Sequence, residues 1–142
     1  KNKGILFFVT GLAGSGKTSI AKKIKREISH LYGPTIEVSG DNFRKIFKFN
    51  KYTQKARNEY LMNYLVFAKL ITDQKINLIF NLIGMYEKAR RWNRKNIDNY
   101  VEIYIKADIH KIINSKKKKF ISEIKRTLLV LTLNQDFQKI RI

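Results

Sequence analysis

The sequence contains no cysteine, and this absence excludes disulfide bonds and thiolate metal sites as supports of the fold. A chain without cysteine fits a reducing compartment, and we expect the protein in the cytoplasm. No apolar run approaches the roughly 20 residues that a membrane-spanning helix needs, so we expect no membrane partner. The basic and apolar stretch 1–11 has no small-residue cleavage site, and we do not interpret it as a signal peptide.

Acidic residues are also scarce. The chain has 30 Lys and Arg against 11 Asp and Glu, which gives a formal net charge of +19 at pH 7. Such an excess is common in nucleic-acid-binding proteins. Here the excess is mostly lysine spread along the chain and forms no recognised nucleic-acid motif, so we expect no nucleic-acid partner. The positive field instead favours polyanionic small substrates such as nucleotides.

Internal repeats and linkers rich in Gly, Ser or Pro are missing, so residues 1–142 are expected to form a single domain. Apolar patterning predicts strands at 4–10, 35–39, 76–83, 101–105 and 128–133, and helices at 15–31, 41–47, 53–74, 85–96 and 108–115. Alternating strands and helices predict an α/β fold, a three-layer α/β/α sandwich with a mostly parallel sheet of roughly five strands.

Two of these helices have clear starts. Thr53 is the expected N-cap of the long helix 53–74, and Asp41 is the expected N-cap of the short helix 41–47. The long helix is amphipathic, with an apolar stripe made of Leu61, Leu65, Ala68 and Ile71.

A glycine-rich segment, GLAGSGKT, joins the first predicted strand to the first helix. The pattern GxxxxGK[ST] in this context is the phosphate-binding loop of P-loop NTPases, whose backbone N–H groups wrap a phosphate chain at a helix N-terminus. Lys17 is expected to reach the β- and γ-phosphates and to act in catalysis, and the Thr18 hydroxyl to ligate Mg²⁺. The expected ATP-binding residues are Gly11, Leu12, Ala13, Gly14, Ser15, Gly16, Lys17 and Thr18.

The loop alone does not choose between a small-molecule kinase, a GTPase and a DNA-dependent ATPase. A chain of 142 residues leaves little room for the switch regions of a GTPase, and no NKxD-like guanine-reading segment follows. A small-molecule kinase is therefore the favoured class.

The segment SGDNFR ends the second predicted strand, where open parallel sheets bind ligands. A carboxylate there can organise Mg²⁺ or accept the proton of an attacking hydroxyl, and Asp41 is the candidate for both roles. Its alternative role is a plain helix cap. Arg44, one turn further on, can pair with an anionic acceptor through its planar guanidinium, or it is a solvated surface residue.

These motifs resemble those of the adenylyl-sulfate kinases, which use ATP to phosphorylate the ribose 3′-hydroxyl of adenosine 5′-phosphosulfate (APS). The family reads G-L-S-G-S-G-K-[ST] and then D-G-D-N-x-R, where this chain has GLAGSGKT and SGDNFR. Two later family motifs correspond to YTQKARNEYLMNYLVFAKL and to EIYIKA at 102–107. The resemblance covers most of residues 5–110 and implies an ATP- and Mg²⁺-dependent kinase that forms 3′-phosphoadenosine 5′-phosphosulfate.

The resemblance also implies roles for single residues. Asp41 matches the family's base or Mg²⁺-organising carboxylate, and Arg44 and Arg57 match arginines that hold the acceptor nucleotide. Tyr52 lies roughly where a phenylalanine of the family stacks on the acceptor's base, and a tyrosine stacks equally well. The family further implies a lid at about 115–126 and a homodimer as the possible assembly.

Several positions depart from the family pattern and most belong to the acceptor side. Ser39 replaces an aspartate, Tyr60 replaces an acceptor-binding asparagine, and Met62 and Asn63 replace paired arginines. The lid has no arginine before Lys116. Two alternatives to an APS kinase therefore stay open: a kinase of another nucleotide, such as a cytidine diphosphate derivative, and a nucleotide-binding module without catalysis.

The segment around 90–94 also has two interpretations. Arg90, Arg91, Trp92 and Arg94 could line the acceptor nucleotide. Alternatively they belong to an ordinary exposed helix on which Trp92 packs against its neighbours, and we favour this interpretation slightly.

Overall fold

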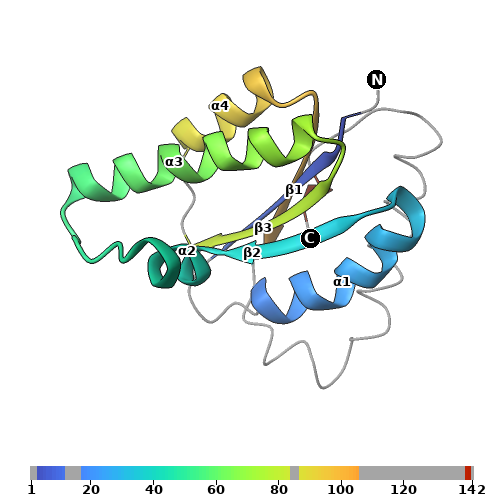
Figure 1. Ribbon diagram of the computed structural model, residues 1–142, viewed down its shortest axis with the longest axis horizontal. Helices are drawn as coiled ribbons and strands as arrows, with labels where there is room; N and C mark the ends of the chain where they lie inside the picture. The colour runs from blue at the N-terminus through green and yellow to red at the C-terminus, as the bar shows by residue number, and fades with distance from the viewer. Residues whose placement is uncertain (1–2, 12–16, 84–86, 106–139, 142) are drawn as a thin grey trace.

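The computed structural model describes residues 3–11, 17–83, 87–105 and 140–141 (Figure 1). Their elements are, in order, β1 (Ile5–Gly11), α1 (Lys17–Tyr32), β2 (Thr35–Ser39), α2 (Gly40–Phe47), α3 (Gln54–Asp73), β3 (Asn77–Ile83), α4 (Glu87–Asn96), β4 (Asn99–Ile105) and β5 (Ile140–Arg141). Of the helices described, none has the length and apolar composition to traverse a bilayer.

The elements predicted up to residue 105 are present, with β4 beginning two residues earlier than expected. The predicted helix 108–115 and strand 128–133 lie outside the described residues. The described last strand, β5, lies at a place where the sequence predicted none, because two residues carry too little apolar pattern to be recognised.

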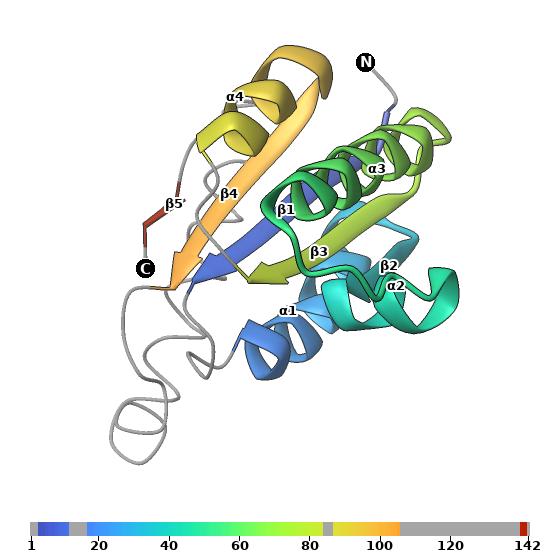
Figure 2. The same cartoon turned by 90° about the vertical axis from the view of Figure 1, so that its left-hand side faces the viewer.

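The sheet is parallel and has the strand order β2-β3-β1-β4-β5. Figure 2 shows its longer strands side by side and pointing the same way. Because β1 lies between β3 and β4, the connection from β1 runs toward one edge of the sheet, to β2, and the later connection from β3 runs toward the other edge, to β4. This arrangement opens a crevice at the carboxyl end of β1, where parallel α/β sheets bind their ligands.

Both faces of the sheet are covered, which gives the predicted three layers (Figures 1 and 2). Side chains alternate along β1, so Phe7 and Val9 pack against α1 while Leu6 and Phe8 pack against α3 and α4. The predicted stripe of α3 is confirmed: Leu61, Leu65 and Ala68 are buried and Ile71 is partly buried.

A buried asparagine fixes the opposite, amino-terminal end of the sheet. The Asn77 side chain accepts a hydrogen bond from the Ile5 N–H at 2.9 Å and donates one to the Tyr32 carbonyl at 3.0 Å. It thereby joins β1 and β3 to the end of α1. Gly33, with φ of 90°, provides the left-handed turn that ends this helix. Asn77 thus helps to fix β1 and β3 relative to the end of α1.

Candidate active site

The two ends of the glycine-rich segment meet at the carboxyl end of the central strand. Gly11 closes β1 and Lys17 opens α1, while the predicted residues Leu12, Ala13, Gly14, Ser15 and Gly16 lie outside the described part of the chain. Lys17 is only 6% exposed, and burial lowers the pKa of its ammonium. The N-terminus of α1 and a buried positive charge are therefore presented where the sequence predicted a phosphate chain.

The Thr18 hydroxyl has a partner that the sequence analysis missed. Asn81 of β3 donates a hydrogen bond from Nδ2 to Thr18 Oγ1 at 3.0 Å. Asn81 is buried, whereas Thr18 is exposed. The signal in the sequence was an asparagine that interrupts the apolar run of β3 near the end of the strand.

Helix α2 begins at Gly40 and its N-cap is Ser39, so the prediction of Asp41 as the cap was wrong. The Ser39 hydroxyl accepts a hydrogen bond from the Asn42 N–H at 3.2 Å, and the Asn42 side chain accepts one from the Ser39 N–H at 2.9 Å. This reciprocal capping box requires an extended residue, and Ser39 still has strand dihedral angles. Asp41 is already inside the first turn, so its carboxylate is not needed as a cap.

The Asp41 carboxylate instead forms an ion pair with Arg44, one turn further along α2. Both side chains are exposed. Exposed pairs of this kind contribute about 0 to 1 kcal/mol, so a substrate can displace either partner at little cost. The pair thus holds a carboxylate and a guanidinium together on α2.

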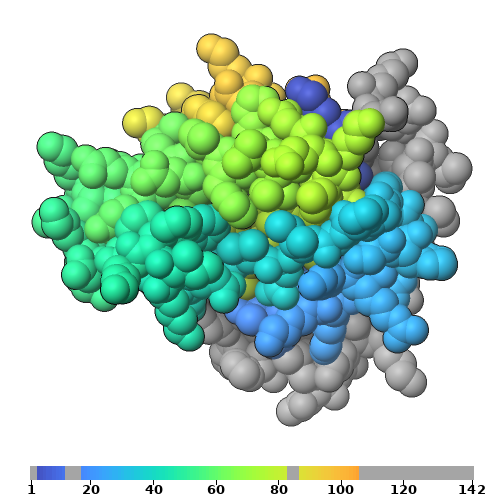
Figure 3. Space-filling model, viewed as in Figure 1, coloured from blue at the N-terminus to red at the C-terminus, as the bar shows by residue number. Residues whose placement is uncertain are grey.

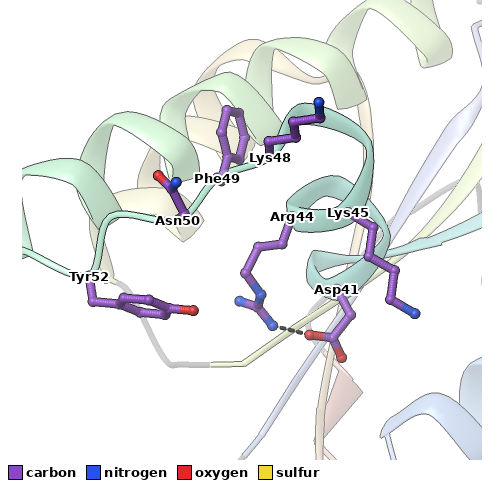
Figure 4. A pocket seen from close by; sticks show the side chains of 7 residues that line it. All are labelled: Asp41, Arg44, Lys45, Lys48, Phe49, Asn50 and Tyr52. Carbon is purple, nitrogen blue, oxygen red and sulfur yellow. Dashed lines mark hydrogen bonds and ion pairs between the residues drawn. The ribbon is translucent and has the colours of Figure 1, made fainter.

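A groove of about 510 Å³ opens beside this pair (Figure 4). In Figure 4 the Tyr52 ring and the Arg44 guanidinium extend toward each other across it. The groove is lined by Asp41, Arg44, Lys45, Lys48, Phe49, Asn50 and Tyr52. The structure thus brings together Asp41, Arg44 and Tyr52 of the predicted acceptor residues. Arg57 lies in the exposed first turns of α3 and is not part of the lining.

Stacked aromatic rings hold the segment that carries Tyr52. Phe49 lies parallel to Tyr60 of α3, with ring centroids 4.1 Å apart and planes inclined by 8°. The Tyr60 hydroxyl also accepts a hydrogen bond from the Lys51 N–H at 3.3 Å. Tyr52 itself is 73% exposed and makes its ring available to a ligand. Figure 3 shows α2 and the start of α3 as one continuous surface at this end of the molecule.

The arginines of α4 bind a buried carboxylate of the neighbouring strand. Glu102 of β4 is 1% exposed and accepts hydrogen bonds from Arg90 at 3.1 Å and from Arg94 at 2.8 Å. Arg91 pairs with Glu87 on the surface, and Trp92 is partly buried against the α3 side of the core. Arg90 and Arg94 therefore neutralise a buried charge, which neither interpretation included, whereas Trp92 packs against its neighbours as the favoured interpretation expected. The sequence analysis missed Glu102 as their partner.

Replacing Glu102 by glutamine is expected to lower the free energy of unfolding by about 3 kcal/mol, because it leaves Arg90 without its buried counter-charge. The measurement is urea denaturation followed by circular dichroism. Glu87→Gln is the matched control, because it removes an exposed partner of the same Arg90 and is expected to cost less than about 1 kcal/mol. Equal effects of the two variants would contradict the structural role of Glu102.

The oxygen atoms of the two predicted ligands suit Mg²⁺, which prefers hydroxyl, carboxylate, water and phosphate oxygens. Thr18 supplies a hydroxyl and Asp41 a carboxylate. Across the residues that the structure describes, no group of three or more His, Cys, Asp or Glu gathers into a metal cage. Two protein ligands are enough for this ion, since Mg²⁺ usually keeps several waters and binds through the substrate's phosphates.

A parallel sheet with a lysine and a threonine opening the first helix after its central strand defines a P-loop α/β protein. Residues 3–129 match the family model described as adenylylsulphate kinase. The chain belongs to this family.

Relatives carry two different activities in their names. The chain is 35% identical to the cytidine diphosphoramidate kinase of Campylobacter jejuni, over 83% of this chain and 69% of the relative. It is 30% identical to the adenylyl-sulfate kinase of Halothermothrix orenii, over 75% of this chain and 58% of the relative. The chain thus spans between about half and about two thirds of the length of these relatives.

The fold also matches a solved structure. The Mycobacterium tuberculosis APS kinase CysC, in complex with AMPPNP and APS, aligns with a TM-score of 0.63 and 23% identity. The alignment covers 74% of this chain and 64% of that structure. At this identity the similarity establishes the shared fold.

Proposed function

We propose that the chain is an ATP-dependent kinase that phosphorylates a hydroxyl of a small ribonucleotide. The observation that carries this proposal is the groove whose lining brings Asp41, Arg44 and Tyr52 together. An arginine, an exposed aromatic ring and a carboxylate suit the phosphate, the base and the reacting hydroxyl of a nucleotide, respectively.

In this proposal ATP lies on residues 11–18, with Lys17 at its β- and γ-phosphates and Thr18 facing Mg²⁺. The acceptor's oxygen attacks the γ-phosphorus in line, and the bond from that phosphorus to the bridging oxygen breaks. ADP leaves, and the hydroxyl proton passes to the Asp41 carboxylate. Mg²⁺ supplies neutralisation of the phosphate charge. The protein contributes mainly positioning and electrostatic stabilisation.

For the acceptor we favour a cytidine diphosphate derivative. The highest identity among the relatives reported above belongs to the cytidine diphosphoramidate kinase. In addition, Tyr60 stands where the adenylyl-sulfate kinases have an acceptor-binding asparagine, and here it stacks on Phe49. Its side chain is used to hold the groove segment, so it cannot supply the asparagine's polar contacts.

APS is the second candidate, with transfer to its ribose 3′-hydroxyl. The family match and the adenylyl-sulfate kinase relatives support it. The retained SGDNFR segment and a groove lined by both Arg44 and Tyr52 are equally compatible with an adenine nucleotide.

The two acceptors are distinguished by ADP release from Mg·ATP in the presence of cytidine diphosphoramidate, CDP, APS or AMP. We expect the highest kcat/KM with the cytidine diphosphate derivative. The highest value with APS would transfer the assignment to adenylyl-sulfate kinase. If none of these nucleotides causes ADP release and the chain still binds Mg·ATP, the non-catalytic nucleotide-binding module would be favoured. The cytoplasmic location and the homodimer remain predictions.

A further inference from the structure

Asn81 is a buried polar residue in a strand whose other central side chains are apolar. It is 4% exposed and lies in register opposite Val9 of β1 and Ser39 of β2. Burying an amide costs free energy unless it is hydrogen-bonded. Among the residues that the structure describes, its side chain donates a hydrogen bond to the Thr18 hydroxyl, 3.0 Å away on α1.

The direction of this hydrogen bond decides which part of the Thr18 hydroxyl is left for a metal ion. A threonine hydroxyl has one proton and two lone pairs. The Asn81 amide donates to one lone pair, which restricts rotation of the hydroxyl. Because Thr18 is exposed and follows Lys17 at the start of α1, its second lone pair is left for a ligand on the nucleotide side.

We propose that Asn81 is a positioning residue for the Mg²⁺–nucleotide complex and acts through Thr18. This inference rests on the ATP-binding part of the proposed function and is independent of the acceptor. Outer residues that orient metal ligands typically contribute 10- to 100-fold in metal affinity. Asn81 adds no charge, so it affects the geometry of the hydroxyl without attracting the ion directly.

The test measures binding and does not depend on turnover. AMPPNP is titrated calorimetrically into the full chain, once with Mg²⁺ and once with EDTA. Asn81→Leu removes the donor at similar volume, and we expect it to weaken Mg·AMPPNP binding about 10-fold. Binding of the metal-free analogue is expected to change less than about 2-fold, because the backbone and Lys17 still hold the phosphates. Equal losses with and without Mg²⁺, or no loss, would overturn the proposal.

A double-mutant cycle separates positioning from general packing. Thr18→Val removes the hydroxyl while keeping the shape, and adding Asn81→Leu to it should cause no further loss of Mg²⁺-dependent affinity. Additive losses would mean that Asn81 acts independently of Thr18 and would refute the inference.

Asn81→Asp keeps the test decisive where the leucine variant fails to fold. Its carboxylate can accept the Thr18 O–H and adds a negative charge near the ion, so we expect the Mg²⁺ preference to be kept or increased. A loss of Mg²⁺ preference in Asn81→Asp would overturn the proposal. A chain that shows the expected Mg²⁺ effects but phosphorylates no acceptor would refute the proposed kinase reaction alone.

Discussion

Replacing Lys17 by alanine is expected to reduce turnover by at least about 10²- to 10³-fold, the loss typical for one preorganised electrostatic donor. Lys17 is the buried cation at the start of α1, and charge spreads over the γ-phosphate oxygens as the transferred group separates. A neutral methyl group at this position cannot stabilise that charge. The measurement is kcat with Mg·ATP and the preferred acceptor.

Lys25→Ala is the matched control, because Lys25 lies exposed on the same helix and its replacement removes the same charge. We expect its kcat to stay within about 2-fold of the parent chain, since a solvated charge far from the phosphates is screened. Comparable activity of the Lys17 variant and this control would remove Lys17 from the catalytic machinery.

Replacing Asp41 by asparagine is expected to lower kcat by about 10²- to 10⁴-fold, the usual contribution of a general base. The amide keeps the shape of the carboxylate but cannot accept the acceptor's proton at neutral pH. Affinity for ATP should change little, because the phosphates of ATP are expected to be held by residues 11–18. Kinetic constants for ATP and for the acceptor are measured separately.

The kinetic constants for ATP and for the acceptor must be measured separately because Asp41 also forms an ion pair with Arg44. If Asp41 only held Arg44 in place, its loss would raise the acceptor's KM and leave kcat nearly unchanged. Asp98→Asn serves as the control, because Asp98 forms a similar exposed pair, with Lys3, at the amino-terminal side of β4. An unchanged kcat in Asp41→Asn would remove its assigned role as a base.

The fold was predictable because apolar residues recur at the regular spacing of strands and helices within short stretches of the sequence. Phe7 and Leu61 belong to runs whose spacing specifies a buried strand and an amphipathic helix, and both lie in the core. The start of α2 was less predictable. Ser39 and Asp41 are both good caps, and only the end of β2 decides which one has the extended backbone.

The position of Lys17 and Thr18 at the start of α1 could be predicted from a local motif, and their roles in binding and catalysis stay predictions. Long-range polar partners were not. Asn81 lies 63 residues from Thr18, and no local pattern reveals that the two meet. Glu102 lies in an apolar strand, which was a signal of a buried charge with a partner, but the sequence does not say that its partners are Arg90 and Arg94.

On the acceptor side, too, the contacts of a side chain could not be predicted from the sequence. A tyrosine at position 60 could have contacted the acceptor through its hydroxyl, and only the structure shows it stacked on Phe49 with its hydroxyl on Lys51. The departures from the adenylyl-sulfate kinase pattern therefore identified where the groove changes. They did not identify how the new side chains are used.

The central claim is transfer of the γ-phosphate of ATP to a nucleotide held in the groove beside Asp41. Its most direct test is incubation of the chain with Mg²⁺, ATP labelled at the γ-phosphate, and each nucleotide of the acceptor panel, followed by chromatography of the products. The account predicts label on a ribose hydroxyl of the cytidine diphosphate derivative, and none with Asp41→Asn on the same time scale. Label that stays in ATP or appears only as inorganic phosphate, whichever nucleotide is present, would contradict it.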